Sequence, residues 1–258
     1  MAFERIAYTP KGREFNTAAS SEFLDLYNDA VESQLERSRE RIPSKTLAPS
    51  SFRCPRIQFF RLRGTKPDTD TKVDTNLEFT SFLGTAIHEE VQQTLSKRLG
   101  SDWLDVADWL ADHDISADVT KSPNGLETLV KLHEIPVKFA VDGLMNINGI
   151  PTLLEIKTAE YDAFRSLDCV RQKHVDQIRC YLTFLGLDRA MVLYIERRFG
   201  GAKCFELAAS EGIRMDVMRQ IYSVLDCAKN EIAPKPLPKG DALCNYCIYQ
   251  NTCEKWGR

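Results

Sequence analysis

Apolar residues recur every three to four positions in six stretches of the chain, which predicts six helices. Pro43 ends the first of them, and Gly100 ends the third. Ser50 and Ser51 precede the second and are predicted to cap it. The six stretches are residues 21–41, 52–62, 77–99, 102–113, 167–186 and 211–232.

Shorter runs that alternate, or that are continuously apolar, predict strands. Asn148-Gly149 lies between the predicted strands 136–143 and 152–158 and is the strongest short-range signal for a hairpin turn. At 258 residues the chain is long enough for one domain with a substantial core and appendages. The predicted strands are residues 126–135, 136–143, 152–158, 190–197 and 203–208.

Composition and charge narrow the class of protein. Hydrophobic residues make up 43% of the chain, but no unbroken apolar run is long enough to span a membrane. The start, Met1 to Arg5, does not have the pattern of a signal peptide, so a cytoplasmic location is expected. The net charge is −3, and any contact with nucleic acid must therefore come from local basic patches.

Candidate chemistry gathers on the predicted hairpin. Glu155 and Lys157 are alternate residues of one strand, so they point to the same side. Pairing with the preceding strand brings Asp142 to the same end of the sheet. Two carboxylates suit Mg²⁺ or Mn²⁺, and an ammonium beside them can orient water or stabilise charge on a phosphate. The alternative is an ordinary hairpin with a surface glutamate and lysine.

Two predicted helices add polar groups. His88 shares a face with Gly84 and points inward, either as a ligand or as a hydrogen-bonded core residue. Gln177 and Tyr181 are four residues apart and lie on one helix face, with Lys173 one turn earlier. They can position a phosphate or a water by hydrogen bonds, or they form a plain helix surface.

The second predicted helix is strongly basic. Phenylalanines are interleaved with its cations, a composition that suits single-stranded nucleic acid, because arginines contact phosphates and rings stack on bases. The alternative is an amphipathic helix with buried rings and a solvated basic face. The candidate DNA-binding residues are Arg53, Arg56, Arg61 and Arg63, together with Lys173.

Three cysteines near the end of the sequence predict a thiolate site that lacks one ligand: Cys244, Cys247 and Cys253. Reduced cytosolic thiols favour metal ligation over a disulfide framework. A four-thiolate site fits either a [4Fe–4S] cluster or structural zinc. The cysteines inside predicted helices and strands are expected to be core residues: Cys169, Cys180, Cys204 and Cys227.

Five features, which follow one another along the chain in the right order, resemble the RecB-like branch of the PD-(D/E)XK nuclease superfamily, and the three late cysteines are the last of them. Cys54-Pro55-Arg56 resembles the first cluster ligand of its iron–sulfur members. The run Gly84 to Glu89 resembles G-x-x-x-H-E, and Gln177 with Tyr181 matches Q-x-x-x-Y. Asp142 followed by Glu155-Ile156-Lys157 resembles D…(D/E)-x-K. In pattern the chain is similar to CRISPR-adaptation exonucleases, the AddB nuclease domain and phage RecB-like exonucleases.

The resemblance implies a restriction-endonuclease-like α/β fold with a mixed central sheet flanked by helices. It implies a tail and helix over 1–49, a nuclease core over 50–233, and a cysteine-rich segment over 234–258. Cys54 would be the fourth ligand of the cluster and would join the two ends of the chain. The resemblance favours iron–sulfur over zinc.

The resemblance also implies a reaction, the hydrolysis of DNA, most simply from single-stranded ends. Lys157 would position the attacking water, while Gln177 and Tyr181 would orient the strand. The implied metal ligands are His88, Asp142, Glu155 and the carbonyl of Ile156. The alternatives are a non-catalytic iron–sulfur module for DNA binding or assembly in recombination or CRISPR adaptation, and a zinc-stabilised regulatory protein. The helix 21–41 is a candidate surface for a homo-oligomer or for a partner protein.

Overall fold

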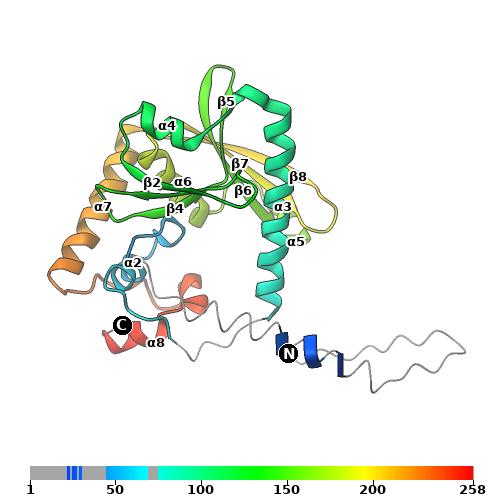
Figure 1. Ribbon diagram of the computed structural model, residues 1–258. Coiled ribbons are helices and arrows are strands. Elements are labelled where there is room, and N and C mark those ends of the chain that lie inside the picture. Colours follow the sequence, from blue (N-terminus) through cyan, green and yellow to red (C-terminus); the bar gives the residue numbers. More distant parts are fainter. Residues whose placement is uncertain (1–21, 24, 28, 31–44, 69–74, 258) are drawn as a thin grey trace, which may run out of the picture.

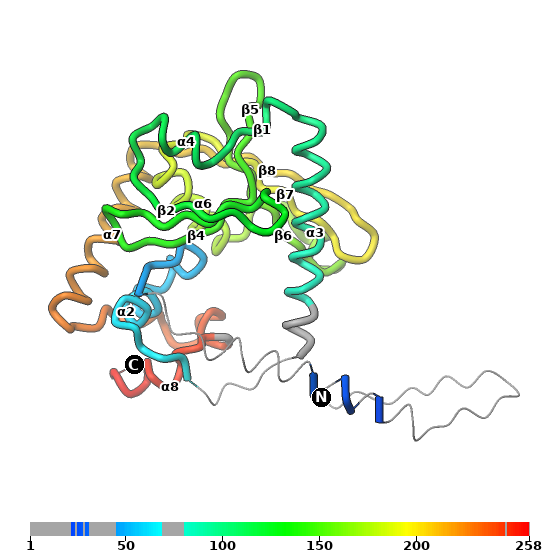
Figure 2. The backbone as a smooth tube through the Cα atoms, viewed as in Figure 1, coloured from blue at the N-terminus to red at the C-terminus, as the bar shows by residue number. Residues whose placement is uncertain are grey.

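The computed structural model describes residues 22–23, 25–27, 29–30, 45–68 and 75–257. Within the predicted helix 21–41, the residues that are described are helical, and the others lie outside the described part of the chain. Figures 1 and 2 show a layered body with a long helix along one side and the C-terminal segment beside an early helix. No described helix combines the length and the apolar character needed to cross a bilayer.

A mixed sheet of five strands forms the centre, in the order β1-β5-β6-β7-β8. Strands β6 and β7 run parallel, and the other neighbouring pairs are antiparallel. The turn at Asn148-Gly149 joins β5 to β6 as predicted, with both residues at positive φ. The strands are β1 (Trp103–Leu104), β5 (Gly143–Ile147), β6 (Ile150–Ala159), β7 (Arg189–Glu196) and β8 (Ala202–Ala208).

Helices cover both faces of this sheet, which confirms the predicted α/β architecture. On one face, Leu154 and Ile156 of β6 pack against Val91 and Leu95 of helix α3 (Thr75–Leu99). Leu153 points to the opposite face, into the larger core shared with α6 (Gln172–Phe184) and α7 (Glu211–Lys229). The alternation along β6 therefore separates two hydrophobic layers.

A second, antiparallel sheet departs from the sequence prediction. It consists of β2 (Ala117–Lys121), β3 (Thr128–Leu132) and β4 (Lys138–Val141). The run 136–143 was predicted as one strand, but it is divided between two sheets, with Asp142 between β4 and β5. Strand β2 was not predicted, because its sequence, Ala-Asp-Val-Thr-Lys, offers few apolar side chains.

The remaining helices are short. The helix predicted over 52–62 begins at Pro55, and Cys54 takes the N-cap position instead of Ser50 or Ser51. Trp103 and Leu104, predicted as helix, pair with β5 before α4 begins. The bounds are α2 (Pro55–Leu62), α4 (Val106–Asp112), α5 (Tyr161–Arg165) and α8 (Gln250–Lys255), with 3-10 turns η1 (Pro49–Ser51), η2 (Gly100–Asp102) and η3 (Ala242–Tyr246).

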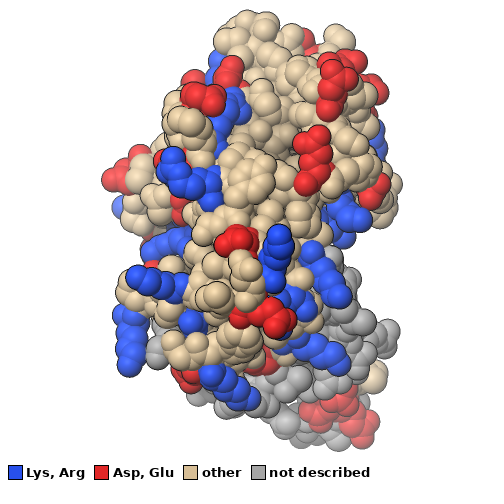
Figure 3. All heavy atoms as spheres, turned by 90° about the vertical axis from the view of Figure 1, so that its left-hand side faces the viewer, with Lys and Arg blue, Asp and Glu red and all other residues tan. Residues whose placement is uncertain are grey.

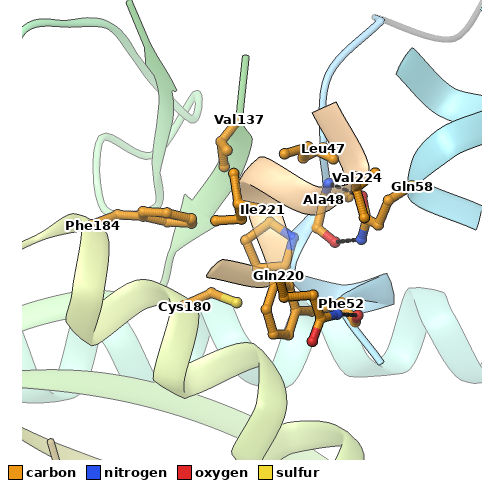
Figure 4. Close-up of a pocket in the computed structure, with 11 residues that line it drawn as sticks. Leu47, Ala48, Phe52, Gln58, Val137, Cys180, Phe184, Gln220, Ile221 and Val224 are labelled. Carbon is orange, nitrogen blue, oxygen red and sulfur yellow. Dashed lines mark hydrogen bonds between the residues drawn. The ribbon is translucent and has the colours of Figure 1, made fainter. Parts of the chain in front are cut away.

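The segment before α2 belongs to the body of the protein. Leu47 forms a parallel bridge with Val137, so buried residues precede the boundary predicted at residue 50. The Gln58 amide pairs with both backbone groups of Ala48, at 2.8 and 2.6 Å (Figure 4). The apolar pocket in this view is a gap between the docked segment and the helices α6 and α7.

The C-terminal segment packs against α2 from a distant part of the sequence. Phe59 and Phe60 are buried and contact the ring of Trp256. Asp68, just after α2, accepts hydrogen bonds from the backbone N–H groups of Asn251 and Thr252 at the start of α8. The C-terminal segment is thus joined to α2 and to the residues that follow it, and Figures 1 and 2 show α8 beside α2.

Candidate functional site

The hairpin β5-β6 brings the predicted carboxylates together. Asp142 enters β5, and its Oδ2 accepts a hydrogen bond of 2.7 Å from the backbone N–H of Ile156. Glu155 and Lys157 lie on the same side of β6, and the Lys157 ammonium contacts Glu155 Oε1. The strict alternation of a strand therefore produces the arrangement expected from the sequence.

Helix α3 completes this cluster from the other side. His88 Nδ1 lies 3.3 Å from Asp142 Oδ1, and one turn later Gln92 donates to the Asp142 carbonyl at 2.7 Å. Position 84, where the helix passes β6, is glycine. A β-carbon there would lie 3.4 Å from the Thr158 hydroxyl of β6, and a longer side chain would push α3 away.

Helix α6 supplies the remaining predicted groups. Gln177 Nε2 donates to Tyr181 Oη at 2.8 Å, and both side chains are buried. The Tyr181 ring stacks on Phe139 of β4, with centroids 5.0 Å apart. One open cleft of about 660 Å³ is lined by these two residues and Lys173 of α6. The same cleft is lined by the cluster described above, which consists of His88, Asp142, Glu155 and Lys157.

Electrostatics in the cleft favour a cation. Asp142 and Glu155 are 5% and 2% exposed. Burial raises the pKa of Glu155 to about 7, the Lys157 ammonium opposes this shift, and the Asp142 charge adds to it. Burial disfavours charge on His88, yet its hydrogen bond to Asp142 and the carboxylate charge raise its pKa. Two buried carboxylates thus share one ammonium.

The donor types fit a hard divalent metal, but the donors are engaged with other groups. One oxygen of Asp142 accepts from Ile156 and the other faces His88, while Glu155 holds Lys157. In the described part of the chain, no three His, Cys, Asp or Glu side chains form a finished metal site. The residues therefore fit Mg²⁺ or Mn²⁺ by their chemistry and not by the present positions of their atoms.

His174 is a cleft residue that the sequence reasoning missed. Its Nδ1 lies 2.6 Å from Tyr194 Oη, and that oxygen accepts a hydrogen bond from the backbone N–H of Arg171. While it accepts from Arg171, the Tyr194 hydroxyl can donate its own proton to Nδ1, an arrangement in which a neutral imidazole carries its proton on Nε2. The signal was helical spacing: His174, Gln177 and Tyr181 follow at intervals of three and four.

His174 also predicts a pH dependence of stability. Burial, followed by the nearby charges of Lys157, Lys173 and Arg171, lowers its pKa to about 3. The unfolded chain takes up this proton below about pH 6.5, whereas the folded chain does not, so acidification favours unfolding from pH 6.5 downward. We expect H174Q to lose less stability than wild type between pH 7 and 5, by up to about 1 kcal/mol per pH unit.

Thermal melts across this pH range measure the effect. The matched control is H113Q, which alters an exposed histidine at the C-cap of α4 that forms no ion pair with a described residue. If the melting temperatures of wild type and H174Q fell in parallel with pH, the conclusion that His174 is neutral in the folded protein would be wrong.

The arginines predicted to bind DNA serve other contacts. Arg56 is buried and donates to the carbonyls of Pro234, Cys253 and Trp256, so it is not available to a phosphate. Arg61 donates to Thr46 O. Because Phe59 and Phe60 are buried, the amphipathic-helix alternative is correct for these two rings.

Arg53 and Arg63 remain partly exposed and are paired with acids, Asp241 and Glu231. Figure 3 shows the face at the left of Figure 1, where lysines and arginines are interspersed with acidic residues over the middle and lower parts. The basic candidate that does lie in the cleft is Lys173.

Cys54, Cys244, Cys247 and Cys253 line one small pocket, and all four thiols are free. Burial raises the pKa of Cys54 and of Cys247. Arg56 donates to the Cys253 sulfur at 3.3 Å. The four residues line the same pocket although they are far apart in sequence, but among the described residues no three His, Cys, Asp or Glu side chains form a finished metal site. Cys169 and Cys204, predicted to be core residues, are exposed.

No protein-family model matches the sequence, and no curated protein is significantly similar to it. Among solved structures, SSO0001 aligns with a TM-score of 0.48 and 15% identity, over 90% of this chain and 98% of that one. The alkaline exonuclease LHK-Exo from Laribacter hongkongensis aligns with a TM-score of 0.40 and 11% identity, over 73% and 90%. The structure of LHK-Exo in complex with dAMP aligns with a TM-score of 0.39 and 10% identity, over 82% of this chain and 95% of that one. Similarity at this level does not assign the chain to a family.

Proposed function

We propose that this protein is a metal-dependent deoxyribonuclease that removes nucleotides from single-stranded DNA ends. One observation carries the proposal: His88, Asp142, Glu155 and Lys157 come from three separate segments and meet in one open cleft. Buried carboxylates and a partly buried ammonium cost folding free energy, and a structural role would be met by apolar residues. Their presence together in a cleft therefore favours chemistry on a charged substrate.

Asp142, Glu155, His88 and the Ile156 carbonyl are the groups that would hold Mg²⁺ or Mn²⁺. When bound, such an ion supplies Lewis acidity and an activated water. Lys157 holds an ammonium at the carboxylate cluster, where it can hydrogen-bond to the attacking water and stabilise charge on the phosphate. Burial disfavours its charge, but Glu155 and Asp142 outweigh this and raise the pKa of Lys157, which keeps it protonated at neutral pH.

Helix α6 provides the groups that would orient the strand. Lys173 offers a cation to a neighbouring phosphate, and His174 offers a neutral N–H donor. Gln177 is fixed by Tyr181, so its amide has a defined direction in the cleft. Hydrogen bonds of this kind position a phosphodiester without adding negative charge.

The four cysteines of the small pocket are proposed to bind a [4Fe–4S] cluster or, as the alternative, structural zinc. The proposal is supported by their common pocket, by the free thiols and by the Arg56 hydrogen bond to Cys253. A metal there would hold α2 to the C-terminal segment and would take no part in hydrolysis.

Cleavage of end-labelled single-stranded DNA tests the nuclease. We expect degradation with Mn²⁺ or Mg²⁺ and none with EDTA, and the product ladder gives the polarity. DNA binding without hydrolysis under any metal would reject the proposal in favour of a non-catalytic binding or assembly module.

A further inference from the structure

Two exposed aromatic rings stand together beyond the catalytic strands. Phe199, in the turn between β7 and β8, is 69% exposed, and Tyr161, the first residue of α5, is 38% exposed. Their rings meet edge to face with centroids 5.6 Å apart. A single exposed apolar side chain is ordinary, but two large rings that contact each other at the surface need another explanation.

The turn that carries Phe199 is held rigidly. The carboxylate of Glu196, which is buried, accepts hydrogen bonds from the backbone N–H groups of Arg198 and Phe199 at 2.7 and 2.5 Å. Gly200 closes the turn at a φ of 72° and donates to the Glu196 carbonyl. The ring is thus presented to solvent by a fixed backbone, so ordering it costs little when a ligand binds.

Helix α5 is fixed in the same way. The Lys203 ammonium donates to the carbonyls of Phe164, Arg165 and Leu167 at the end of the helix. Arg197, at the start of the turn, contacts the Glu160 carboxylate at the helix N-cap. These contacts join the turn to the helix as one surface.

Each ring lies beside a cation. The Arg198 guanidinium lies over Phe199 at 4.9 Å from the ring centroid, and that of Arg165 lies 5.6 Å from the Tyr161 centroid. Neither arginine forms an ion pair with a described residue. Exposed rings with unpaired guanidinium groups suit a ligand that has both flat faces and negative charge, which is the chemistry of single-stranded nucleic acid.

The surface adjoins the cleft. Thr158 lines the cleft, and Tyr161 follows three residues later, so their Cα atoms are at most about 11 Å apart. Strands β6 and β7 run parallel, with Ala159 opposite Glu196 at their ends. Both rings therefore follow the ends of the two strands, of which β6 carries Glu155 and Lys157.

We propose that Tyr161 and Phe199, with Arg165 and Arg198, form a stacking platform for the unpaired bases of a DNA strand that enters the cleft. The proposal deepens the nuclease assignment and rests on it for the identity of the strand. This surface would explain why the enzyme requires unpaired bases, because a base inside a duplex cannot stack its face on a protein ring.

Binding of a fluorescently labelled oligothymidylate of roughly ten nucleotides tests the platform. Anisotropy is measured with Ca²⁺ in place of Mg²⁺ or Mn²⁺, so that binding is read without cleavage. We expect F199A to bind about tenfold more weakly than wild type. F199L keeps most of the apolar area but has no ring, so it should bind as weakly as F199A, while F199W should bind as wild type does. The matched control is Y222A, which removes an exposed tyrosine from α7 on the other side of the body (Figure 1).

A strand of the same length with abasic sites separates stacking from charge. We expect F199A and wild type to bind this strand equally. An equal penalty on both strands, full binding by F199L, or no binding of oligothymidylate by the wild type would overturn the platform.

Hydrolysis of thymidine 5′-p-nitrophenyl phosphate separates this proposal from the nuclease assignment. The substrate is too short to reach the rings, so F199A should hydrolyse it at the wild-type rate. If wild type hydrolyses neither this ester nor DNA, the nuclease assignment fails, while the anisotropy series still decides the platform.

Discussion

Replacing Lys157 with alanine removes DNA cleavage, with a fall in rate of at least about 100-fold, while the protein stays folded and still binds DNA. The expected loss is large because Lys157 places its ammonium against Glu155 inside the cleft. No other lysine or arginine among the described residues forms an ion pair with Glu155 or Asp142. A neutral side chain cannot stabilise the charge that develops on the phosphate.

The measurement is metal-dependent release of labelled nucleotides by wild type and K157A, with binding measured on the same strand. K157M is the second variant, since it keeps most of the volume of the lysine stem and guards against a packing defect. K131A is the matched control, because Lys131 is an exposed lysine on the small sheet. Cleavage by K157A at the rate of K131A would refute the role of Lys157.

Replacing Cys244 with alanine lowers the melting temperature by more than about 10 °C and reduces solubility, if the four thiolates share a metal. The reason is that metal-binding free energy adds to folding free energy, and each ligand contributes to it. Without a metal, removing one half-buried thiol from the pocket would change stability little. The fall in melting temperature of C244A is therefore large if a metal is bound and small if none is.

Melting temperature, iron and zinc per chain, and visible absorption after anaerobic purification measure this effect. The control is C169A, which removes an exposed cysteine that does not line the pocket. Brown colour and iron would support [4Fe–4S], and colourless protein with zinc would support the alternative. A C244A variant with wild-type stability and metal content would show that no such site exists.

The features that sequence predicted best are those with strict local geometry. Glu155 and Lys157 share a side because strand periodicity is two, and Asn148-Gly149 sets the hairpin that brings Asp142 beside Ile156. The helix that carries His88 was predicted almost to its bounds, since a long amphipathic pattern with glycine after it is a strong signal.

The features that sequence missed depend on contacts between distant segments. The sequence around Arg56 does not indicate that its guanidinium donates hydrogen bonds to Cys253. A basic stretch has the same sequence pattern whether its arginines contact phosphates or backbone carbonyls. Tyr161 and Phe199 belong to different elements and meet only because β6 and β7 are parallel neighbours. Local patterns carry no information about such pairings.

The contact between Arg56 and Cys253 has a consequence for synthesis of the chain. The two residues are 197 positions apart, and at roughly 5–20 residues per second a ribosome needs on the order of 10–40 s to make that length. During this time Phe59 and Phe60 lack Trp256, the ring that covers them in the folded protein. Helix α2 therefore keeps two phenylalanine rings uncovered until Trp256 is made, and during this time we expect it to be a site of aggregation or chaperone binding.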